Sequence, residues 1–384
     1  MIVAAKARLR PARVAHVVLG LNVGGLERVV LRLLERTRRD LFSPVIVALE
    51  APGELAAELD RLDVPLVMIP RRRGGGLDPG LAVRLAAWLR DEGVALVHTH
   101  NPGPHLYGAF AAALVRAGGC SWPRVVHTKH GRNFPRASRK VLANRLASAF
   151  TDRVVAVSAD ARAVVIEIER VDPARVITIL NGVDTEEYRP GGDPGAARAR
   201  LGAPPCGYHV GCVARLSAEK DHATLLAAFA RLRSRRAGAH LTLVGDGPLR
   251  QDLEREAARL GVAGAVTFAG TRPDVAALLP AFDVFALASR SEGISLTLIE
   301  AAAVGIPLVA TRVGGNAEIL GEGEAGLLVP PGEPDALAAA LEAVAARPDR
   351  AELGRRGRAR VVARFGADSM ARAYGELYEE LLDR

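Results

Sequence analysis

Hydrophobic positions along the chain follow two alternating patterns. Short runs rich in Val, Ile and Leu alternate with longer segments in which apolar residues recur at i, i+3, i+4 and i+7. Residues 26–34 are an example of the second pattern, because their apolar side chains would share one side of a helix. The alternation predicts repeated βαβ units, and strands covered by helices on both faces predict parallel sheets.

The predicted strands fall into two groups. A loop at 189–205, which begins RPGGDPG, interrupts the alternation with residues typical of turns. Because 384 residues exceed one ordinary core, we expect an α/β fold with Rossmann-like domains at 1–190 and 191–365. A last helix at 366–384 could pack back on the N-terminal domain. Strands are predicted at 14–19, 44–49, 66–69, 95–98, 124–127, 154–157, 176–180, 208–213, 240–244, 266–269, 284–287, 308–310 and 327–329, and the closing helices at 334–346, 350–365 and 367–382.

Composition is that of a soluble globular protein, since 49% of the residues are hydrophobic and 24% are charged. No apolar stretch approaches the roughly 18 residues that cross a bilayer, and the first residues lack the apolar region of a secretion signal. We therefore expect a cytoplasmic protein. The three cysteines, Cys120, Cys206 and Cys212, lack metal-ligand spacing and are interpreted as reduced thiols.

The net charge of +8 comes from the part of the chain before residue 190. That part holds 28 Lys and Arg against 19 Asp and Glu, whereas the rest holds 23 against 24. A nucleic acid, an anionic membrane surface, an anionic substrate or a merely solvated surface would each be compatible with this excess.

One segment within the basic half predicts a helix that is both basic and apolar. The sequence PRASRKVLANRLASAF at 135–150 combines Arg136, Arg139, Lys140 and Arg145 with an apolar stripe of Leu142, Leu146 and Phe150. Such a helix could lie in the headgroup region of an anionic membrane, which would make the protein peripheral on the inner face. Alternatively, the stripe could pack on the sheet.

Unusual residues gather directly after the predicted strands. In open parallel sheets, ligands bind beyond the carboxyl ends of the strands, so these loops predict a ligand site. The loops include GLNVGGLE at 20–27, HTKHG at 127–131, ARLSAEK at 214–220, GDGP at 245–248 and ASRSEG at 288–293.

The glycines in these loops could serve phosphate binding. Gly24 and Gly25 would permit close backbone approach and leave N–H groups free for a phosphate. They lack the G-x-G-x-x-G spacing, the pair Gly245 and Gly247 has no third glycine, and no P-loop sequence occurs. Dehydrogenases and P-loop nucleotidases are therefore disfavoured.

Two cations and two carboxylates are candidates for the chemistry. Arg215 and Lys220 lie near one predicted helix start, an arrangement that suits a diphosphate. Glu292 and Glu300 are separated by seven residues, with Glu292 before a helix and Glu300 in its second turn. The N–H groups at the start of that helix would be unpaired, where the helix dipole favours an anion, and they belong to Ser295, Leu296 and Thr297.

These motifs resemble the large family of retaining glycosyltransferases of GT-B fold, of the family-four type or group 1, which carries an E-x7-E signature. The resemblance extends along nearly the whole chain. It implies two Rossmann-like domains facing across a cleft, with the acceptor side at 1–190 and the nucleotide-sugar side at 191–365. The motifs are VGGLERV, LNGVD, ARLSAEK, LTLVGDGPLR, FAGTRPDV, the Glu pair, ATRVGGNAEI and GLLVPPGEPDAL.

The resemblance also implies a role for each candidate residue. Arg215 and Lys220 would neutralise the leaving diphosphate together with the helix start at 295–297. Glu300 would hold the ribose hydroxyls and Glu292 those of the donor sugar. His130 would lie beside the donor sugar, with His127 as the alternative. Further donor contacts are expected from Gly24, Gly25, Thr271, Arg272 and Ile294.

The implied activity is a hexosyl transfer from a UDP- or GDP-linked sugar to a glycan or lipid-linked acceptor, in polysaccharide or glycolipid assembly. A donor phosphate oxygen would accept the proton of the acceptor on the same face of the sugar. We expect no further cofactor, no nucleic-acid partner and no metal. The sequence has no D-x-D motif, and His98 and His100 have no third ligand at a matching spacing.

Two departures from the family pattern are visible. Positions 294–297 read ISLT, and Asp221 and His222 stand where glycine is more usual. Two other functions stay open at this point. One is a sugar-nucleotide epimerase on the same fold, and the other is a catalytically silent protein that docks on membranes or polymers.

Overall fold

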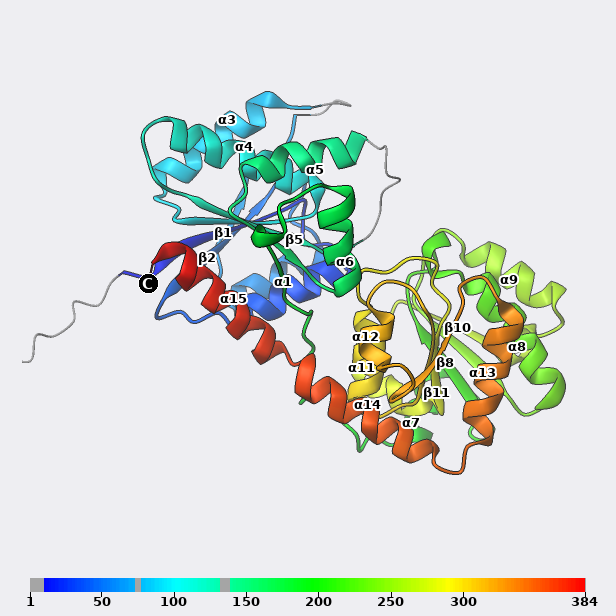
Figure 1. Ribbon diagram of the computed structural model, residues 1–384. Coiled ribbons are helices and arrows are strands. Elements are labelled where there is room, and N and C mark those ends of the chain that lie inside the picture. The colour runs from blue at the N-terminus through cyan, green and yellow to red at the C-terminus, as the bar shows by residue number, and fades with distance from the viewer. Residues whose placement is uncertain (1–9, 73–76, 132–138, 384) are drawn as a thin grey trace, which may run out of the picture. The chain divides into compact units, whose positions relative to one another are not determined.

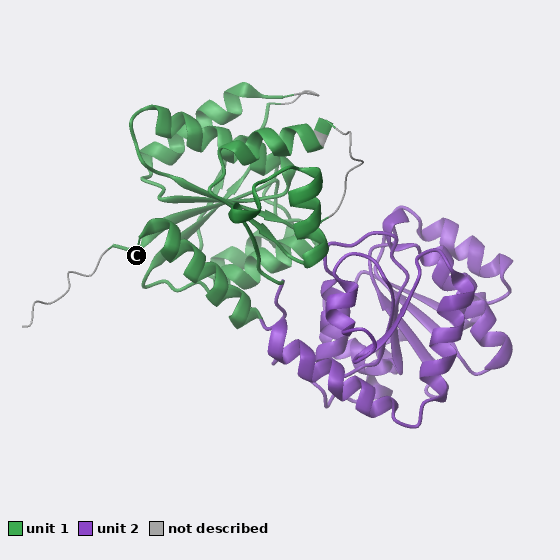
Figure 2. Ribbon diagram, viewed as in Figure 1, with its two compact units in different colours: residues 1–180, 367–384 green, residues 181–366 purple. Residues whose placement is uncertain are grey.

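The computed structural model describes residues 10–72, 77–131 and 139–383 (Figure 1). The chain divides into two compact units, shown in different colours in Figure 2. Unit 1 comprises residues 1–180 and 367–384, and unit 2 comprises residues 181–366.

Unit 1 is built on a seven-stranded sheet with the order β3-β2-β1-β4-β5-β6-β7. Every neighbouring pair is parallel. The strands are β1 (Ala12–Val18), β2 (Phe42–Ala48), β3 (Leu66–Met68), β4 (Leu96–His100), β5 (Arg124–Lys129), β6 (Arg153–Ala156) and β7 (Val176–Thr178).

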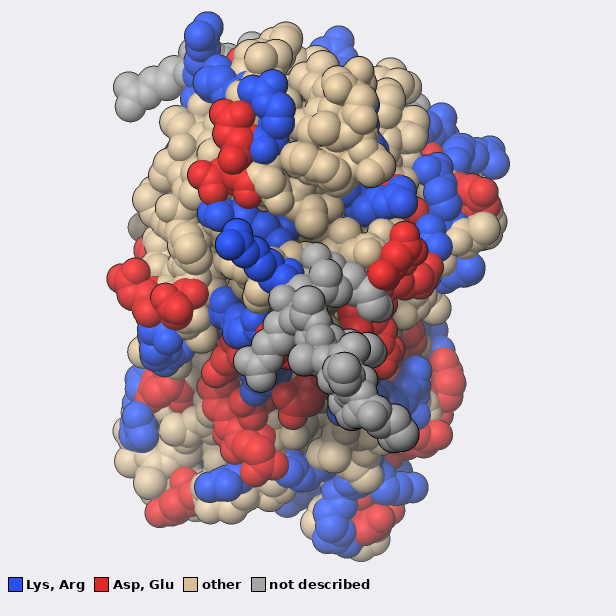
Figure 3. Space-filling model, turned by 90° about the vertical axis from the view of Figure 1, so that its left-hand side faces the viewer, with Lys and Arg blue, Asp and Glu red and all other residues tan. Residues whose placement is uncertain are grey.

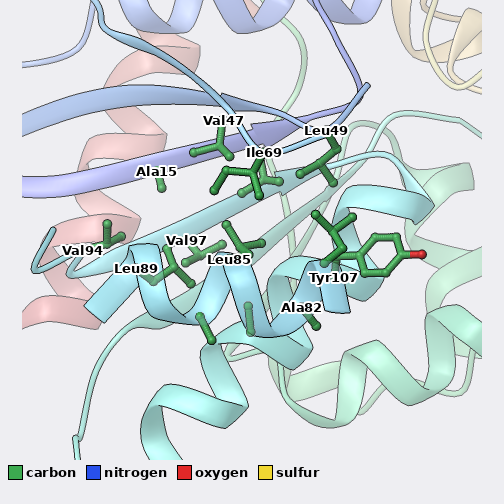
Figure 4. Packing of buried hydrophobic residues seen from close by; sticks show 14 of the residues in the cluster. Ala15, Val47, Leu49, Ile69, Ala82, Leu85, Leu89, Val94, Val97 and Tyr107 are labelled. Carbon is green, nitrogen blue, oxygen red and sulfur yellow. The ribbon is translucent and has the colours of Figure 1, made fainter. Parts of the chain in front are cut away.

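Helices cover both faces of this sheet, as Figure 1 shows. On one face lie α3 (Pro79–Asp91), α4 (Pro102–Ala117) and α5 (Arg139–Ala149), and on the other lie α1 (Gly25–Glu35) and α15 (Ala367–Leu382). Successive residues of a strand point to opposite faces, so β2 contributes to two separate cores. Val45 and Val47 pack in the cluster that includes α3 and α4 (Figure 4), whereas Ile46 and Ala48 pack in the cluster that includes α1.

The last helix, α15, is attached to the sheet of unit 1 by buried polar contacts. The hydroxyl of Tyr378 lies 2.6 Å from Nδ1 of His98, and the hydroxyl of Tyr374 lies 2.9 Å from Oγ1 of Thr128. The ring of Tyr378 also packs edge-on against Phe42. These contacts explain why a segment so far along the chain belongs to the N-terminal unit.

Unit 2 is built on a six-stranded parallel sheet with the order β10-β9-β8-β11-β12-β13. The helices α8 and α13 contact each other on one side, and α11 and α14 contact each other on the other side (Figure 1). The strands are β8 (His209–Val213), β9 (His240–Val244), β10 (Val266–Gly270), β11 (Val284–Leu287), β12 (Leu308–Thr311) and β13 (Gly326–Val329). The helices are α7 (Pro194–Leu201), α8 (His222–Arg235), α9 (Arg250–Arg259), α11 (Leu296–Val304), α12 (Asn316–Leu320), α13 (Pro334–Ala346) and α14 (Arg350–Arg364).

Both sheets have the strand order of a Rossmann-like fold, so the predicted fold class is confirmed. The units meet in the sequence at residues 180 and 181, before the boundary at 190 that the glycine-rich loop predicts. Residues 181–190 belong to unit 2. They are bonded to it because Val183 donates its N–H to the carbonyl of Phe365 and the side chain of Arg358 donates to the carbonyl of Tyr188. In each sheet the first three strands are added toward one edge and the later strands toward the other edge. The strand order therefore reverses between β1 and β4 and between β8 and β11. Such switch points are where ligands bind in this class of fold.

Candidate active site

The switch point of unit 2 brings Lys220 and Glu292 together. Lys220 lies in a short turn after β8, and Glu292 lies in the loop after β11. Nζ of Lys220 donates to Oε1 of Glu292 at 2.6 Å, and the hydroxyl of Ser289 donates to the same oxygen at 2.6 Å. Glu292 is buried, so these two donors offset the desolvation of its charge. Ser289 was not predicted from the sequence, although it stands in the same loop.

The loop of Glu292 packs against the two glycines of the VGGN motif at 313–316. The N–H of Gly315 donates to the carbonyl of Gly293 at 2.8 Å. Gly314 has φ +51°, and a Cβ placed there would lie 2.2 Å from the carbonyl oxygen of Glu292. Only glycine fits this contact, which therefore positions the backbone of a candidate catalytic residue.

Asp221 occupies a left-handed backbone conformation, with φ +46°. Glycine adopts this conformation without strain, and aspartate is among the few other residues that tolerate it. Its carboxylate accepts hydrogen bonds from the hydroxyl of Thr224 at 2.8 Å and from Nε of Arg290 at 2.8 Å. The departure from the family pattern at this position thus adds a cap to α8 and a tie between the loops of Lys220 and Glu292.

Arg215 is held in a different way from Lys220. Its side chain is exposed and makes no hydrogen bond or ion pair with the residues that the structure describes. Its loop, in contrast, is fixed by the GDGP turn after β9. A Cβ on Gly245 would lie 2.1 Å from the carbonyl oxygen of Ala214, and one on Gly247 would lie 2.5 Å from that of Leu216. The sequence pattern alone did not reveal this packing, because it joins two loops through the backbone.

The start of α11 offers free N–H groups beside Glu292. Ser295 is the N-cap, and its hydroxyl accepts a hydrogen bond from the N–H of Leu298 at 3.3 Å. The N–H groups of Leu296 and Thr297, in the first turn, have no partner within the helix. Glu300 lies in the second turn and is buried. The start of α11, Lys220 and Glu292 therefore all lie beyond the carboxyl ends of β8 and β11. An anion that carries hydroxyl groups could bind there.

Arg272 lies apart from this group. It follows β10, which is the edge strand, and β9 and β8 separate β10 from β11. Two nitrogens of its guanidinium contact both carboxylate oxygens of Asp274, at 2.9 and 2.8 Å. The pKa of Asp274 is lowered to about 2, mainly by these hydrogen bonds. The contacts of Arg272 are thus with Asp274 and the carbonyl of Arg200, and not with Lys220 or Glu292.

In unit 1, Gly24 and Gly25 form the start of α1. Gly24 is the N-cap and offers no side chain to the first N–H groups of the helix. The carboxyl of Glu27 lies in this first turn, and burial raises its pKa. The N–H of Glu27 bonds to this carboxyl, and its Oε2 would lie 2.4 Å from a Cβ on Gly24. An acidic group thus lies at the start of α1, and the phosphate contact of Gly24 and Gly25 stays a prediction.

The two histidines of HTKHG differ in environment. His127 is buried within β5, and its ring stacks on that of His105 with centroids 3.7 Å apart. His130 follows the strand and lines a small cavity of about 30 Å³ together with Asn101 and Gly131. Nε2 of His130 lies 3.1 Å from Nδ1 of His100. Burial lowers the pKa of His130 to about 3, so the imidazole is neutral at physiological pH.

A third histidine joins the pair that the sequence considered for a metal. His16 on β1 lies in register with His98 on β4, and suitable ring nitrogens of His16, His98 and His100 lie within 4.8 Å of one another. Sequence spacing could not reveal His16, because parallel pairing of distant strands brings it there. Both nitrogens of His98 already contact hydroxyl groups, at Tyr378 and Thr128.

Within the part of the chain that the structure describes, the helices are all too short or too polar to cross a bilayer. Two models of known protein families match the chain. Residues 207–347 match the family model described as glycosyl transferases group 1, and residues 23–187 match the one described as glycosyltransferase family 4.

Several curated proteins are similar in sequence. The D-inositol 3-phosphate glycosyltransferase of Frankia alni is 32% identical over 310 residues, which cover 75% of this chain and 74% of the relative. The UDP-Gal:alpha-D-GlcNAc-diphosphoundecaprenol alpha-1,3-galactosyltransferase of Escherichia coli is 28% identical over 79% of this chain and 80% of its own length. The lipopolysaccharide core biosynthesis glycosyltransferase LpsE of Rhizobium meliloti is 36% identical, but the match covers only 52% of that protein and 47% of this chain.

The fold also resembles solved structures. The Anabaena protein Alr3699/HepE in complex with UDP superposes with a TM-score of 0.84, 22% identity and coverage of 96% of this chain and 100% of that one. A likeness at this level of identity concerns the fold. The two family models, the relative from Frankia alni and the solved structure all point to one family. The chain therefore belongs to the family-4, group 1 glycosyltransferases of GT-B fold.

Proposed function

We propose that the chain transfers a hexosyl group from a nucleotide-diphosphate sugar to a glycan or lipid-linked acceptor, with retention of the anomeric configuration and without a metal ion. The observation that carries the proposal is the grouping of Lys220, Glu292 and the start of α11 at the switch point of unit 2, with Arg215 exposed nearby in sequence. Cations and free N–H groups match a diphosphate, and a carboxylate matches sugar hydroxyls.

Charge stabilisation accounts for the proposed chemistry. When the bond between the sugar and the diphosphate breaks, negative charge grows on the leaving phosphate. Arg215, Lys220 and the dipole of α11 supply fixed positive charge for it. Lys220 forms an ion pair with Glu292, so a bound diphosphate would compete with the carboxylate for the same ammonium group.

Retention of the anomeric configuration is proposed for two reasons. The E-x7-E segment resembles that of retaining glycosyltransferases, and its first carboxylate, Glu292, is already hydrogen-bonded. One oxygen of Glu292 already accepts hydrogen bonds from Lys220 and Ser289, which suits a group that orients hydroxyls rather than a nucleophile. A donor phosphate oxygen would then take the proton of the acceptor hydroxyl.

Similar proteins support the nature of the substrates. The structurally similar Anabaena protein was solved in complexes with UDP and with UDP-glucose. The name of the Escherichia coli relative specifies a UDP-sugar donor and a diphosphoundecaprenol acceptor. We extend both features, a nucleotide-sugar donor and an acceptor on a lipid carrier, to this chain.

The activity is tested by incubating the purified chain with a panel of UDP- and GDP-linked hexoses and following the anomeric protons by NMR. Slow release of nucleotide diphosphate, with the sugar first appearing in the α configuration from an α-linked donor, is expected. Activity that is unchanged by EDTA is also expected. Release of the β anomer would contradict retention, and loss with EDTA that Mg²⁺ or Mn²⁺ restores would contradict the metal-free site. Epimerisation of the intact donor would indicate the epimerase instead.

The proposal includes docking of unit 1 on an anionic membrane, where a lipid-linked acceptor would be found. No Asp or Glu occurs between Glu92 and Asp152, a stretch that includes the whole of β4, α4, β5 and α5. Figure 3 shows a different situation on the face that it draws, where Lys and Arg are interspersed with Asp and Glu. Three cations of the stretch have acidic partners outside it, since Lys129 pairs with Glu169 and both Arg116 and Arg124 pair with Asp152. The basic residues of α5 are therefore the ones that matter for docking.

The predicted apolar stripe lies on the surface rather than on the sheet. The helix α5 runs from Arg139 to Ala149, Phe150 follows it, and Arg136 lies outside the described residues. Leu142 is 58% exposed, Leu146 51% and Phe150 40%. The same layer of helices exposes Leu114 of α4 and Val83 of α3. An exposed apolar stripe beside basic residues fits the headgroup region, where each cation contributes about 1 kcal/mol.

Co-sedimentation with vesicles tests the docking. Binding to vesicles that contain phosphatidylglycerol is expected, and it should weaken with salt and fall strongly in the double variant L142S/L146S. The variant R231S/R235S removes two cations of α8 in unit 2 and serves as the control that should still bind. If the wild-type chain ignores anionic vesicles at low salt, the membrane part of the proposal fails while the transferase part stands.

A further inference from the structure

The loops of Lys220 and Glu292 are joined by a second ion pair, between Asp221 and Arg290. Nε of Arg290 donates to Oδ2 of Asp221 at 2.8 Å, and the backbone N–H of Arg290 donates to the carbonyl of Glu219 at 2.8 Å. The two partners differ in exposure, because the side chain of Asp221 is 4% exposed and that of Arg290 is 66% exposed. A buried carboxylate thus has its counter-ion at the surface.

Asp221 brings a negative charge to the place where we expect a diphosphate, because it follows Lys220 directly in the chain. Its carboxylate is fixed in the first turn of α8, where it accepts the hydroxyl of Thr224 at 2.8 Å. Glycine, the more usual residue of the family at this position, carries no charge. A carboxylate beside Lys220 attracts the ammonium group and repels a phosphate. Asp221 therefore needs compensation if Lys220 is to serve a diphosphate.

Arg290 is the group that can supply this compensation. The next residue, His222, is unsuitable, because burial first of all, and then the charge of Lys220, lower its pKa to about 4 and leave the imidazole neutral. The start of α8 contributes only a partial positive charge. A guanidinium carries a full charge at every physiological pH, and its hydrogen bond to Asp221 raises the pKa of Arg290 further.

We infer that Arg290 is the counter-ion of Asp221 and thereby keeps the ammonium group of Lys220 available to the diphosphate of the sugar donor. Without Arg290, the uncompensated carboxylate of Asp221 would compete with the phosphate oxygens for Lys220. Arg290 acts through Lys220 and is a positioning residue. The role of Lys220 rests on the proposed function, whereas the ion pair of Asp221 and Arg290 does not.

Two other roles of Arg290 lead to different results when the pair is dissected. If Arg290 contacted the phosphate itself, its loss could not be repaired by a change at Asp221. If the pair were only a mechanical link between the two loops, loss of either partner would have the same effect. The counter-ion role predicts instead that removal of Asp221 repairs the loss of Arg290, so the effects of the two substitutions are strongly non-additive.

Calorimetric titration of the full chain with UDP and with GDP measures binding, and kcat/KM for the sugar donor measures turnover. In Arg290→Gln, Kd should rise and kcat/KM should fall, each about tenfold, the usual size of one interaction with a charged group. Asp221→Gly should bind at least as tightly as the wild type, since glycine adopts the same backbone conformation without strain and is accepted as an N-cap. The double variant D221G/R290Q should return to within about threefold of the wild type.

Salt and a matched control separate the charge of Arg290 from its bulk. Because salt screens interactions between partly exposed charges, the difference between Arg290→Gln and the wild type should shrink in about 0.5 M NaCl. Arg347→Gln removes another guanidinium that pairs with an aspartate, Asp349, between α13 and α14. This control should leave binding and turnover unchanged. The side chain of Arg290 is largely exposed, so Arg290→Gln is expected to fold.

Three results would overturn the counter-ion role. They are wild-type binding and turnover in Arg290→Gln, a double variant as impaired as Arg290→Gln, and an Asp221→Gly variant as impaired as Arg290→Gln. The second result would indicate a direct contact with the phosphate, and the third a mechanical link. If the wild type binds neither UDP nor GDP, the diphosphate site of the proposed function fails and the inference fails with it. If Arg290→Gln binds the nucleotide as the wild type does, the inference fails while the proposed function stands.

Discussion

Arg215 and Lys220, the two candidate cations of the site in unit 2, are held in different ways. Lys220 is bonded to the buried Glu292, whereas Arg215 is exposed on a loop whose backbone is fixed by two glycines. Both side chains would stabilise the same leaving group. Their removal should nevertheless affect the folded protein differently, because only Lys220 has an internal partner.

Arg215→Ala and Lys220→Ala are each expected to slow turnover about 10²- to 10³-fold, the usual loss when an oriented charge donor is removed. Only Lys220→Ala should also destabilise the protein, by about 1–3 kcal/mol, because Glu292 would stay buried with less compensation. Steady-state rates and urea unfolding measure the two effects. Near-normal rates in both variants would remove these residues from the proposed site.

Gly247→Ala tests whether the GDGP turn positions Arg215. A Cβ at 2.5 Å from the carbonyl oxygen of Leu216 forces the loop of Arg215 to move. We expect a loss of at least about tenfold in kcat/KM and a destabilisation of about 1–3 kcal/mol, typical of forced overpacking. Gly264→Ala is the matched control, since a Cβ there meets nothing within 4 Å. Equal behaviour of the two variants would show that the turn does not position the loop.

At the scale of elements, most of the secondary structure could be predicted. The runs at 240–244 and 284–287 match β9 and β11 to the residue, because short apolar runs bounded by turn residues are typical of buried strands. The helix at 334–346 also matches, with Pro334 at its first turn. The helix at 367–382 matches α15 as well. Most other boundaries shifted by one or two residues, as at β1, where pairing with β2 extends the strand back to Ala12.

The site was predictable only where its residues are close in sequence. Glu292, Ser295 and Glu300 share one loop and one helix, so their spacing determines their geometry. The contact between Lys220 and Glu292 and the packing of Gly314 behind Glu292 join segments that are distant in sequence. Strand order decides such contacts, and the pattern within one segment carries no information about it.

The N-cap of α11 offers a prediction at this scale. Ser295→Ala removes the hydroxyl that accepts the N–H of Leu298, and it should destabilise unit 2 by about 1 kcal/mol in urea unfolding. Ser234→Ala, at an exposed position late in α8, is the control and should change stability by only a few tenths. If the two variants are equally stable, the cap does not stabilise the start of α11.

At the scale of the whole molecule, the histidines are unevenly distributed. Six of the nine lie in unit 1, and the pKa of each is lowered by burial first of all. The unfolded chain binds protons on them near pH 6.5, whereas the folded unit binds them only at much lower pH. Their contribution to stability is therefore complete above pH 6.5 and is lost as the pH falls toward 3.

Unit 1 should accordingly open before unit 2 on acidification. Each fully buried imidazole lowers the stability by up to about 1.4 kcal/mol per pH unit below 6.5. Hydrogen exchange followed by mass spectrometry between pH 7 and pH 5 should show protection lost first in peptides of β1, β4 and β5. His105→Leu should reduce the pH dependence. Simultaneous loss of protection in both units would contradict the prediction.

The position of α15 has a consequence for synthesis on the ribosome. All seven strands of unit 1 are made before residue 181, but Tyr374 and Tyr378, the partners of Thr128 and His98, are made only after the whole of unit 2. Unit 2 is continuous in sequence and can fold while the chain is still growing. Unit 1 cannot be completed until α15 is made, and until then the face of its sheet that α15 covers is accessible to water and to chaperones. A chain that stops before residue 367 would thus contain a complete unit 2 and a first unit that lacks α15 on one face of its sheet.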